Sequence, residues 1–267
     1  MWPSEHAAAG VARAGGVIGA AGDTAHEFAF ASVTKLFTAY ATLIAAEEGS
    51  VELDDPAGPD GSTLRHLLAH ASGLGPDGDV LSPPERTRIY SNAAIDLLAE
   101  EVETRTGIAF ADYLAEAVLR PLELGAALHG RPAEGMVGTL DDLLAFGREL
   151  LDPRLISRET IDEATSVQFP GLKGVLPGFG RMEPNDWGLG FELRDGKTPH
   201  WTGSRNGPGT FGHFGSKSGS ATFLWVDRDA GLACAGLADV DFGAWAKEAW
   251  PALADAVLSE GSRAAAG

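Results

Sequence analysis

The sequence predicts an α+β fold in which both ends of the chain build one antiparallel sheet and a helical lobe is inserted between them. Strand-like segments open the chain, helical periodicity dominates its middle, and from Trp187 the period changes to that of strands joined by tight turns. We therefore expect residues 1–50 and 185–260 to form an α/β lobe and residues 51–184 a mainly helical lobe. Residues 261–267 are expected to form a flexible tail.

The N-terminal contribution to the sheet comes before the first helix. Strand-like apolar segments lie at residues 16–21 and 27–30. A helix is expected to begin at Ser32 and to end at Gly49, because glycine readily adopts the left-handed conformation that closes a helix.

The middle of the chain has the periodicity of amphipathic helices. Residues 92–105 place apolar side chains on one face and glutamates on the other, and Gly107 ends this pattern. Further helices are expected over residues 110–119 and 139–151, with Thr139 as the N-cap of the second.

The C-terminal part is expected to complete the sheet and to add a final helix. The predicted strands are residues 187–193, 210–214, 221–227 and 232–237, and the helix is residues 245–259.

The composition excludes several kinds of partner. A net charge of −18 would repel phosphate backbones and anionic lipids, so neither nucleic acid nor a membrane is an expected partner. The apolar stretch 7–21 is interrupted by Arg13 and glycines, which is typical of neither a signal peptide nor a membrane span. The sequence as written predicts a cytoplasmic protein, although a chain trimmed of a leader would look the same. The single cysteine, Cys234, is expected to be a buried structural thiol.

Ser32 and Lys35 are the first candidate catalytic pair. Residues three apart share one helix face, so the Lys35 amine can approach the Ser32 hydroxyl and accept its proton. Lys35 lies beside an apolar stripe, and burial would lower its pKa toward neutrality. The same spacing is also typical of a helix cap followed by a solvated lysine, and the pair alone leaves that alternative open.

Tyr90 and Asn92 precede the helix expected at residues 92–105 and can project from its start. A phenol near Lys35 could pass a proton to a leaving group, and the Asn92 amide could hold Lys35 or a substrate carbonyl. The alternative is an ordinary helix start, with Ser91 or Asn92 as the cap.

Two neighbouring triplets compete at the end of the strand predicted over residues 210–214. His213-Phe214-Gly215 ends that strand, and Lys217-Ser218-Gly219 follows four residues later. Small residues here would let a substrate lie along the strand edge, where a backbone N–H can reach a developing oxyanion.

Other chemical motifs are weak or missing. His66 and His70 have the spacing of a helical zinc pair but lack the accompanying glutamate and a third ligand, so no metal is expected. The sequence contains no Gly-x-Ser-x-Gly, and Gly15 to Gly19 lack the spacing of a phosphate-binding loop. No cofactor is expected.

Six motifs occur in the order found in a known superfamily. They are Ala31-Ser32-Val33-Thr34-Lys35, Leu67-Leu68-Ala69-His70-Ala71-Ser72-Gly73-Leu74, Tyr90-Ser91-Asn92, Pro121-Leu122, Trp187-Gly188-Leu189-Gly190-Phe191 and Gly212-His213-Phe214-Gly215. The chain thereby resembles the serine β-lactamase and penicillin-binding-protein superfamily, in particular its class C-like branch. That branch also holds D-alanyl-D-alanine peptidases, D-aminopeptidases and esterases.

The resemblance implies an αβα sandwich with a helical lobe and an active site between them. It implies that Ser32 is acylated, that Lys35 and Tyr90 share proton transfer, and that Asn92 positions Lys35 and the substrate. About thirty residues precede Ser32, so the family's N-terminal helix is expected to be missing or very short.

The resemblance also assigns the third catalytic motif of the superfamily to His213-Phe214-Gly215, and this triplet is called the third motif below. His213 would occupy its first position in His213-Phe214-Gly215, and the backbone N–H groups of Ser32 and Ser216 would form the oxyanion hole. Many β-lactamases carry lysine where this chain has His213, and a neutral imidazole attracts a carboxylate less than an ammonium does. Lys217 would restore the charge if it faced inward.

The expected function is a serine hydrolase acting on a small ester or amide through an acyl-enzyme on Ser32. The alternatives are a β-lactamase or D-Ala-D-Ala carboxypeptidase, with a β-lactam or peptide as substrate, and a non-catalytic binding module. The oligomeric state stays open.

Overall fold

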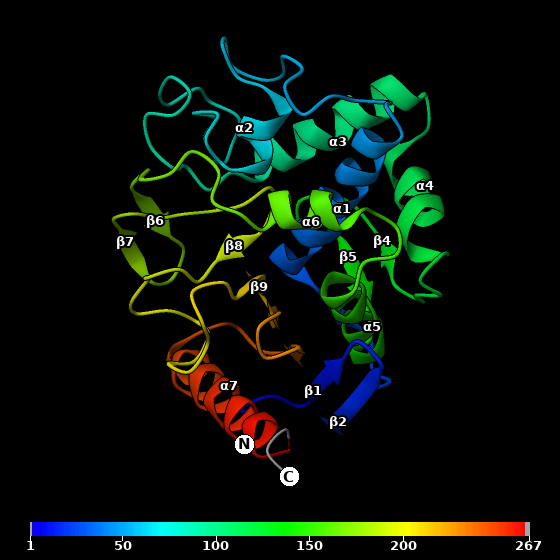
Figure 1. The fold of residues 1–267 in the computed structure, drawn as a ribbon, viewed down its shortest axis with the longest axis vertical. Coiled ribbons are helices and arrows are strands. Elements are labelled where there is room, and N and C mark those ends of the chain that lie inside the picture. Colours follow the sequence, from blue (N-terminus) through cyan, green and yellow to red (C-terminus); the bar gives the residue numbers. More distant parts are fainter. Residues whose placement is uncertain (1, 265–267) are drawn as a thin grey trace.

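The computed structural model describes residues 2–264 and is built around a six-stranded sheet with the order β2-β1-β11-β10-β9-β8 (Figure 1). Every neighbouring pair is antiparallel. The strands are β1 (Ala7–Arg13), β2 (Gly16–Gly22), β8 (Glu192–Leu193), β9 (Phe211–Lys217), β10 (Ser220–Asp227) and β11 (Leu232–Ala238). The predicted sheet from both chain ends is confirmed.

Helices cover both faces of this sheet. Successive side chains of a strand point to opposite faces, and in the central strands apolar side chains lie on both faces. Leu224 of β10 joins the core that contains α5 (Leu140–Leu151), whereas Phe223 and Trp225 join the core that contains Trp250 of α7 (Ala244–Ala264). Every residue of β10 and β11 is therefore buried. The result is an αβα sandwich.

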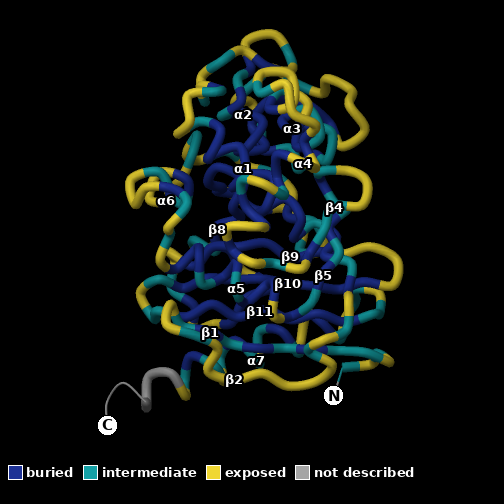
Figure 2. The backbone as a smooth tube through the Cα atoms, turned by 90° about the vertical axis from the view of Figure 1, so that its right-hand side faces the viewer, coloured by how far each residue is buried: buried dark blue, intermediate teal, exposed yellow. Residues whose placement is uncertain are grey.

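The helical lobe packs around α1 (Thr34–Glu47), whose residues Thr34–Ala45 are all buried. Figure 2 shows α1 and the central strands buried, with exposed loops outside them. The other elements are η1 (Ala31–Val33), α2 (Leu64–Leu68), α3 (Asn92–Thr106), α4 (Phe110–Leu114), the π-helical η2 (Ala115–Leu119), α6 (Arg158–Ala164), and the short strands β3 (Phe28–Ala29), β4 (Ala127–Leu128), β5 (Met136–Gly138), β6 (Gly174–Leu176) and β7 (Gly180–Met182).

Several elements differ from their predicted extents. Strand β1 was not predicted, because its alanines and glycines have little β propensity; pairing with β2 and β11 fixes it instead. The predicted strand 187–193 shrinks to β8, because the chain turns at Gly190, which has φ +82° and packs against Ala39 of α1.

The boundaries of the lobes also differ from the sequence-based division. Helix α5 falls inside the range 51–184 given to the helical lobe, yet it packs on β1, β10 and β11. Helix α7 continues through Ala264 and so takes up part of the predicted tail 261–267, whose last residues, 265–267, lie outside the described residues. Within the described chain no helix precedes β1, and none combines the length and apolarity needed to cross a bilayer.

Candidate active site

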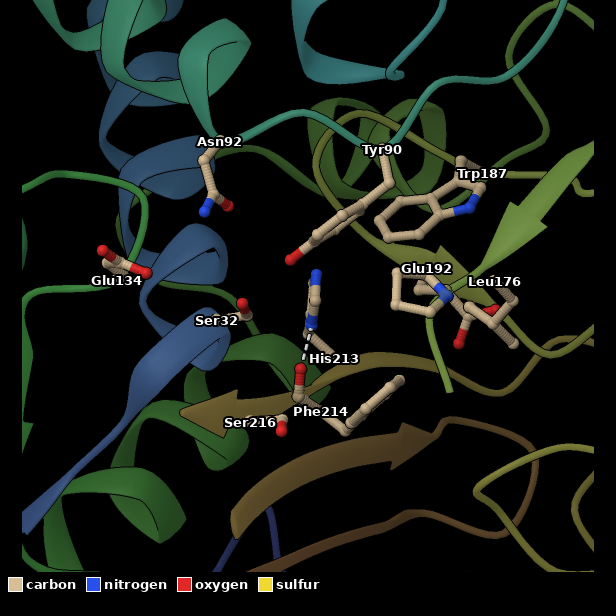
Figure 3. A pocket seen from close by; sticks show the side chains of 11 residues that line it. Ser32, Tyr90, Asn92, Glu134, Leu176, Trp187, Glu192, His213, Phe214 and Ser216 are labelled. Atoms are coloured by element: carbon tan, nitrogen blue, oxygen red, sulfur yellow. Dashed lines mark hydrogen bonds between the residues drawn. The ribbon is translucent and has the colours of Figure 1, made fainter. Parts of the chain in front are cut away.

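A cavity of about 250 Å³ opens between the sheet edge at β9 and the helical lobe (Figure 3). Residues from both lobes line it: Ser32, Tyr90, Asn92, Glu134, Leu176, Pro177, Trp187, Glu192, His213, Phe214 and Ser216. The structure thus brings together Ser32, Tyr90, Asn92, His213 and Ser216, which the sequence separates by up to 184 positions.

Ser32 is held at a sharp turn where η1 leads into α1. Ala31 has φ +46°, in the left-handed region that non-glycine residues rarely adopt. Strand β9 presses against this turn, since a Cβ on Gly215 would lie 2.4 Å from the Phe30 carbonyl oxygen. The Thr222 hydroxyl donates to that same oxygen at 2.8 Å. Position 215 therefore requires glycine, because any side chain there would collide with the Phe30 carbonyl oxygen. This close contact holds the turn with Ser32 against the sheet.

Lys35 lies one helical turn from Ser32 and is completely buried. Its Nζ is 3.1 Å from the Ser32 Oγ and donates to the Ala133 carbonyl oxygen at 2.9 Å. Burial lowers the pKa of Lys35 to about 7, although the nearby carboxylates of Glu134 and Asp96 act to raise it. Near neutral pH a large fraction of Lys35 is an uncharged amine within reach of the serine proton.

Tyr90 lies beside both Lys35 and Ser32. The Lys35 Nζ is 4.9 Å from the centroid of the Tyr90 ring. Burial raises the pKa of Tyr90 well above its ordinary value, and a hydrogen bond with Ser32 only partly opposes this. The phenol therefore stays protonated and can pass a proton on, whereas it is a poor base in the free enzyme.

Asn92 projects into the cavity because its neighbour caps the helix. The Ser91 Oγ accepts from the Ala94 N–H at 3.0 Å and donates to the Gly75 carbonyl oxygen at 2.8 Å. The helix cap is the Ser91 side chain, and the Asn92 Oδ1 is buried without a hydrogen-bond partner among residues 2–264. A buried orphan acceptor at the wall of a cavity is placed to meet a ligand or a catalytic group.

The third motif presents His213 to the cavity, and Lys217 is exposed beyond it at the end of β9. His213 Nδ1 is 2.5 Å from the Phe214 carbonyl oxygen, while Nε2 has no hydrogen-bond partner in the described part of the chain. Because a carbonyl only accepts, the proton belongs on Nδ1 and the Nε2 lone pair faces the cavity. Burial lowers the pKa of His213 to about 3, so this imidazole is neutral at physiological pH.

The strand register indicates which way the backbone N–H of Ser216 points. The turn at residues 218–219 pairs Lys217 with Ser220. Residues that flank a two-residue turn exchange hydrogen bonds, so the N–H of Ser216 points away from β10 toward the other edge of β9. In the described chain β8 pairs only with Phe211 and Gly212, which leaves that edge open at Ser216. With the N–H of Ser32 in the first turn of its helix, this arrangement can bind an oxyanion.

Glu192, which the sequence analysis did not identify, lines the cavity. Its carboxylate contacts Lys197 Nζ at 2.7 Å and His200 Nε2 at 2.9 Å, and it accepts from Trp201 Nε1 at 2.6 Å. Burial alone would raise the pKa of Glu192, but His200 and Lys197 lower it to about 2. Its charge is thus paired internally.

The two histidines with zinc-like spacing turn to separate partners. His66 Nδ1 is 2.8 Å from the Thr63 Oγ1, and its Nε2 is 3.1 Å from Glu85. His70 Nδ1 accepts from the Ser91 N–H at 3.3 Å. Across residues 2–264, no three His, Cys, Asp or Glu side chains gather in a way that could hold a metal ion.

Comparisons with known proteins identify the family of this chain. A family model described as Beta-lactamase matches residues 5–258. A crystal structure of a β-lactamase from Mycobacterium bovis is 50% identical, with a TM-score of 0.94 over 97% of this chain and 96% of that one. No curated protein matches the chain.

Two more distant structures share the fold alone. A D-stereospecific amidohydrolase from Streptomyces sp. is 23% identical, with a TM-score of 0.71 over 93% of this chain and 94% of that one. EstCE1, described as a hydrolase with promiscuous acyltransferase activity, is 18% identical, with a TM-score of 0.76 over 96% and 94%.

Proposed function

This chain belongs to the β-lactamase family of hydrolases, and from that premise we propose that it is a serine hydrolase that forms an acyl-enzyme on Ser32. The observation that supports this most strongly is the buried Lys35 amine, with a pKa of about 7, at 3.1 Å from the Ser32 Oγ. A nucleophile, a base poised near neutrality and oxyanion donors around one cavity are what acyl transfer requires.

Acylation begins when neutral Lys35 accepts the Ser32 proton and Oγ attacks the substrate carbonyl carbon. The carbonyl oxygen becomes an oxyanion facing the N–H groups of Ser32 and Ser216. The intermediate collapses by breaking the bond to the leaving group. The leaving group takes a proton from Tyr90, and Tyr90 is reprotonated by Lys35, which holds the proton from Ser32. Water then attacks the acyl carbonyl carbon and gives a proton to Lys35 or Tyr90. The bond between that carbon and the Ser32 Oγ breaks, Oγ takes the proton back, and the acid is released.

A small ester or amide fits this cavity better than a carboxylate-bearing β-lactam. His213 is neutral and offers no cation, and Lys217 is exposed beyond the cavity. A β-lactamase is the second candidate, favoured by the description of the 50% identical M. bovis protein as a β-lactamase.

Intact-protein mass spectrometry distinguishes these functions. The protein is incubated separately with a nitrophenyl ester, a penicillin and a fluorophosphonate. We expect a fluorophosphonate adduct and rapid ester turnover. Rapid turnover of penicillin would favour the β-lactamase, and a lasting adduct with penicillin alone would favour a penicillin-binding peptidase. No adduct and no turnover with any probe would contradict the proposed function.

Tyr90→Phe is expected to slow ester hydrolysis most for substrates with poor leaving groups. The phenol supplies a proton that an alkoxide needs and a nitrophenolate does not, so kcat/KM should fall about 10- to 100-fold for an alkyl ester and much less for the nitrophenyl ester. Equal slowing of both esters would show that Tyr90 only packs against Trp187 and His213.

His213→Lys is expected to improve acylation by carboxylate-bearing β-lactams about 5- to 30-fold, because a cation beside a bound carboxylate favours it. Uncharged esters should change little in comparison. Lys217→Ala is the control, since this exposed residue should not affect anionic substrates. If Lys217→Ala abolishes turnover of anionic substrates while His213→Lys changes nothing, the working triplet is Lys217-Ser218-Gly219.

A further inference from the structure

Glu134 lines the cavity and lies in a turn that is held by hydrogen bonds from two helices. The Lys35 Nζ donates to the Ala133 carbonyl oxygen at 2.9 Å, and the Thr38 hydroxyl donates to the Pro132 carbonyl oxygen at 2.7 Å. From α3, Asp96 accepts from the Ala133 N–H at 3.0 Å. The turn is therefore held in place by both α1 and α3.

The carboxylate of Glu134 itself is only loosely engaged. Its one ion pair among the described residues is with Arg131 Nη1 at 3.8 Å. Arg131 is already committed to Asp96, to which its Nε and Nη2 donate at 2.8 and 2.5 Å. The Glu134 side chain keeps 35% of its surface exposed and borders the cavity, so a ligand can reach it.

The rest of the cavity carries no opposing fixed charge. Among the described lining residues there is no lysine or arginine, His213 is neutral, and the charge of Glu192 is paired with Lys197. Above pH 7 Lys35 is mostly neutral as well. The cavity therefore keeps one accessible charge whose ion pair is long, which is that of Glu134.

We propose that Glu134 forms a subsite for a positively charged group, such as an ammonium, on the acyl part of the substrate. Figure 3 shows Glu134 across Ser32 from Tyr90. Tyr90 serves the leaving group, so the opposite side receives the acyl part; this assignment of sides rests on the proposed function. An ammonium has three donors and no acceptor, which matches a carboxylate that lacks close donors of its own.

The subsite is tested by binding, with the chemistry removed. Ser32→Ala protein is titrated at pH 8 with 4-(aminomethyl)benzamide, which carries a charged amine, and with 4-ethylbenzamide, its neutral counterpart; the meta isomers are tested in the same way. The cationic amide should bind about 3- to 10-fold more tightly than the neutral one, as expected for a partly exposed charge pair.

Two second-site variants show which charge is responsible. Adding Glu134→Gln should bring the ratio of the two dissociation constants close to one, while Glu134→Asp should keep part of the preference. Glu101→Gln is the matched control, because Glu101 has a similarly loose contact, 3.9 Å from Arg105, and does not line the cavity. It should keep the full preference.

The proposal is overturned if the Ser32→Ala protein binds both amides equally, or if the preference survives Glu134→Gln. It is also overturned if Glu101→Gln reduces the preference as much as Glu134→Gln does, since the net charge of the whole protein would then be the cause. Because Ser32→Ala cannot react, none of these results depends on serine chemistry, which the mass spectrometry tests separately.

Discussion

Ser32→Ala is expected to reduce ester hydrolysis at least 10³-fold and to abolish fluorophosphonate labelling, because the Ser32 hydroxyl lies at the cavity 3.1 Å from the buried Lys35 amine that can activate it. The fold should be retained, because removing the Ser32 Oγ takes away only its polar contacts with Lys35 and Tyr90 among the described residues and leaves both of these side chains in place. The measurements are kcat/KM for a nitrophenyl ester and the thermal unfolding midpoint.

Ser259→Ala is the control for this variant, because Ser259 lies on α7 and its hydroxyl donates to the Asp255 carbonyl oxygen away from the cavity. Its activity should match that of the wild type. Activity above a few per cent in Ser32→Ala would mean that another residue is the nucleophile.

Lys35→Met should lower the acylation rate about 10²- to 10⁴-fold while the protein stays folded or becomes more stable. Methionine keeps the apolar stem and removes the base. In the wild type, acylation should rise with pH and level off above about pH 7, as Lys35 loses its proton. The variant should lack this dependence. Single-turnover rates across pH 5–9 provide the measurement.

The stability effect of Lys35→Met has a defined pH dependence. The pKa of Lys35 is about 7 in the folded protein and close to 10.4 when unfolded, so the unfolded chain binds more protons between these values. The wild type therefore gains stability as pH rises through this window. The variant should exceed it by about 1–3 kcal/mol below pH 7, and the difference should shrink toward pH 10.

Lys247→Met on α7 serves as the matched control, because Lys247 is exposed and its removal should show neither effect. If Lys35→Met unfolds the protein and the wild-type rate does not change between pH 5 and 9, Lys35 is structural and not the base.

The fold could be predicted because its main signals are periodic. The change of period at Trp187 and the apolar runs in β10 and β11 are local properties of the sequence, and the structure confirms the sheet that they indicate. Strand β1 has no such signal. Its small residues are selected by close packing, as at Gly10, where a Cβ would lie 2.7 Å from a Leu144 methyl carbon.

The motifs predicted several residues that line the cavity, but spacing along the chain could place together only residues of the same motif. The spacing of Ser32 and Lys35 places them together on any helix, but the complete burial of Lys35 results from packing between the lobes. His213 and Lys217 fall on the same face of a strand, so alternation could not choose between them. The structure separates them along the strand, by about 13 Å, which puts Lys217 beyond the cavity.

Glu134 and Glu192 had no signal of their own. Each lies between the recognised motifs and reaches the cavity through contacts far apart in the sequence, such as those of the Glu134 turn with α1 and α3. The sequence motifs therefore indicated a hydrolase of the β-lactamase family, whereas residues outside those motifs, such as Glu134, gave no indication of the substrate.

Trapping the acyl group on the chain tests the central claim most directly. The protein is mixed with a nitrophenyl ester, quenched in acid during turnover and digested with trypsin, which cuts after Arg13 and Lys35. The acyl mass should appear on the peptide of residues 14–35, and fragmentation should place it on Ser32. An acyl group found on any other residue, or turnover without an acylated peptide, would contradict the acyl-enzyme on Ser32.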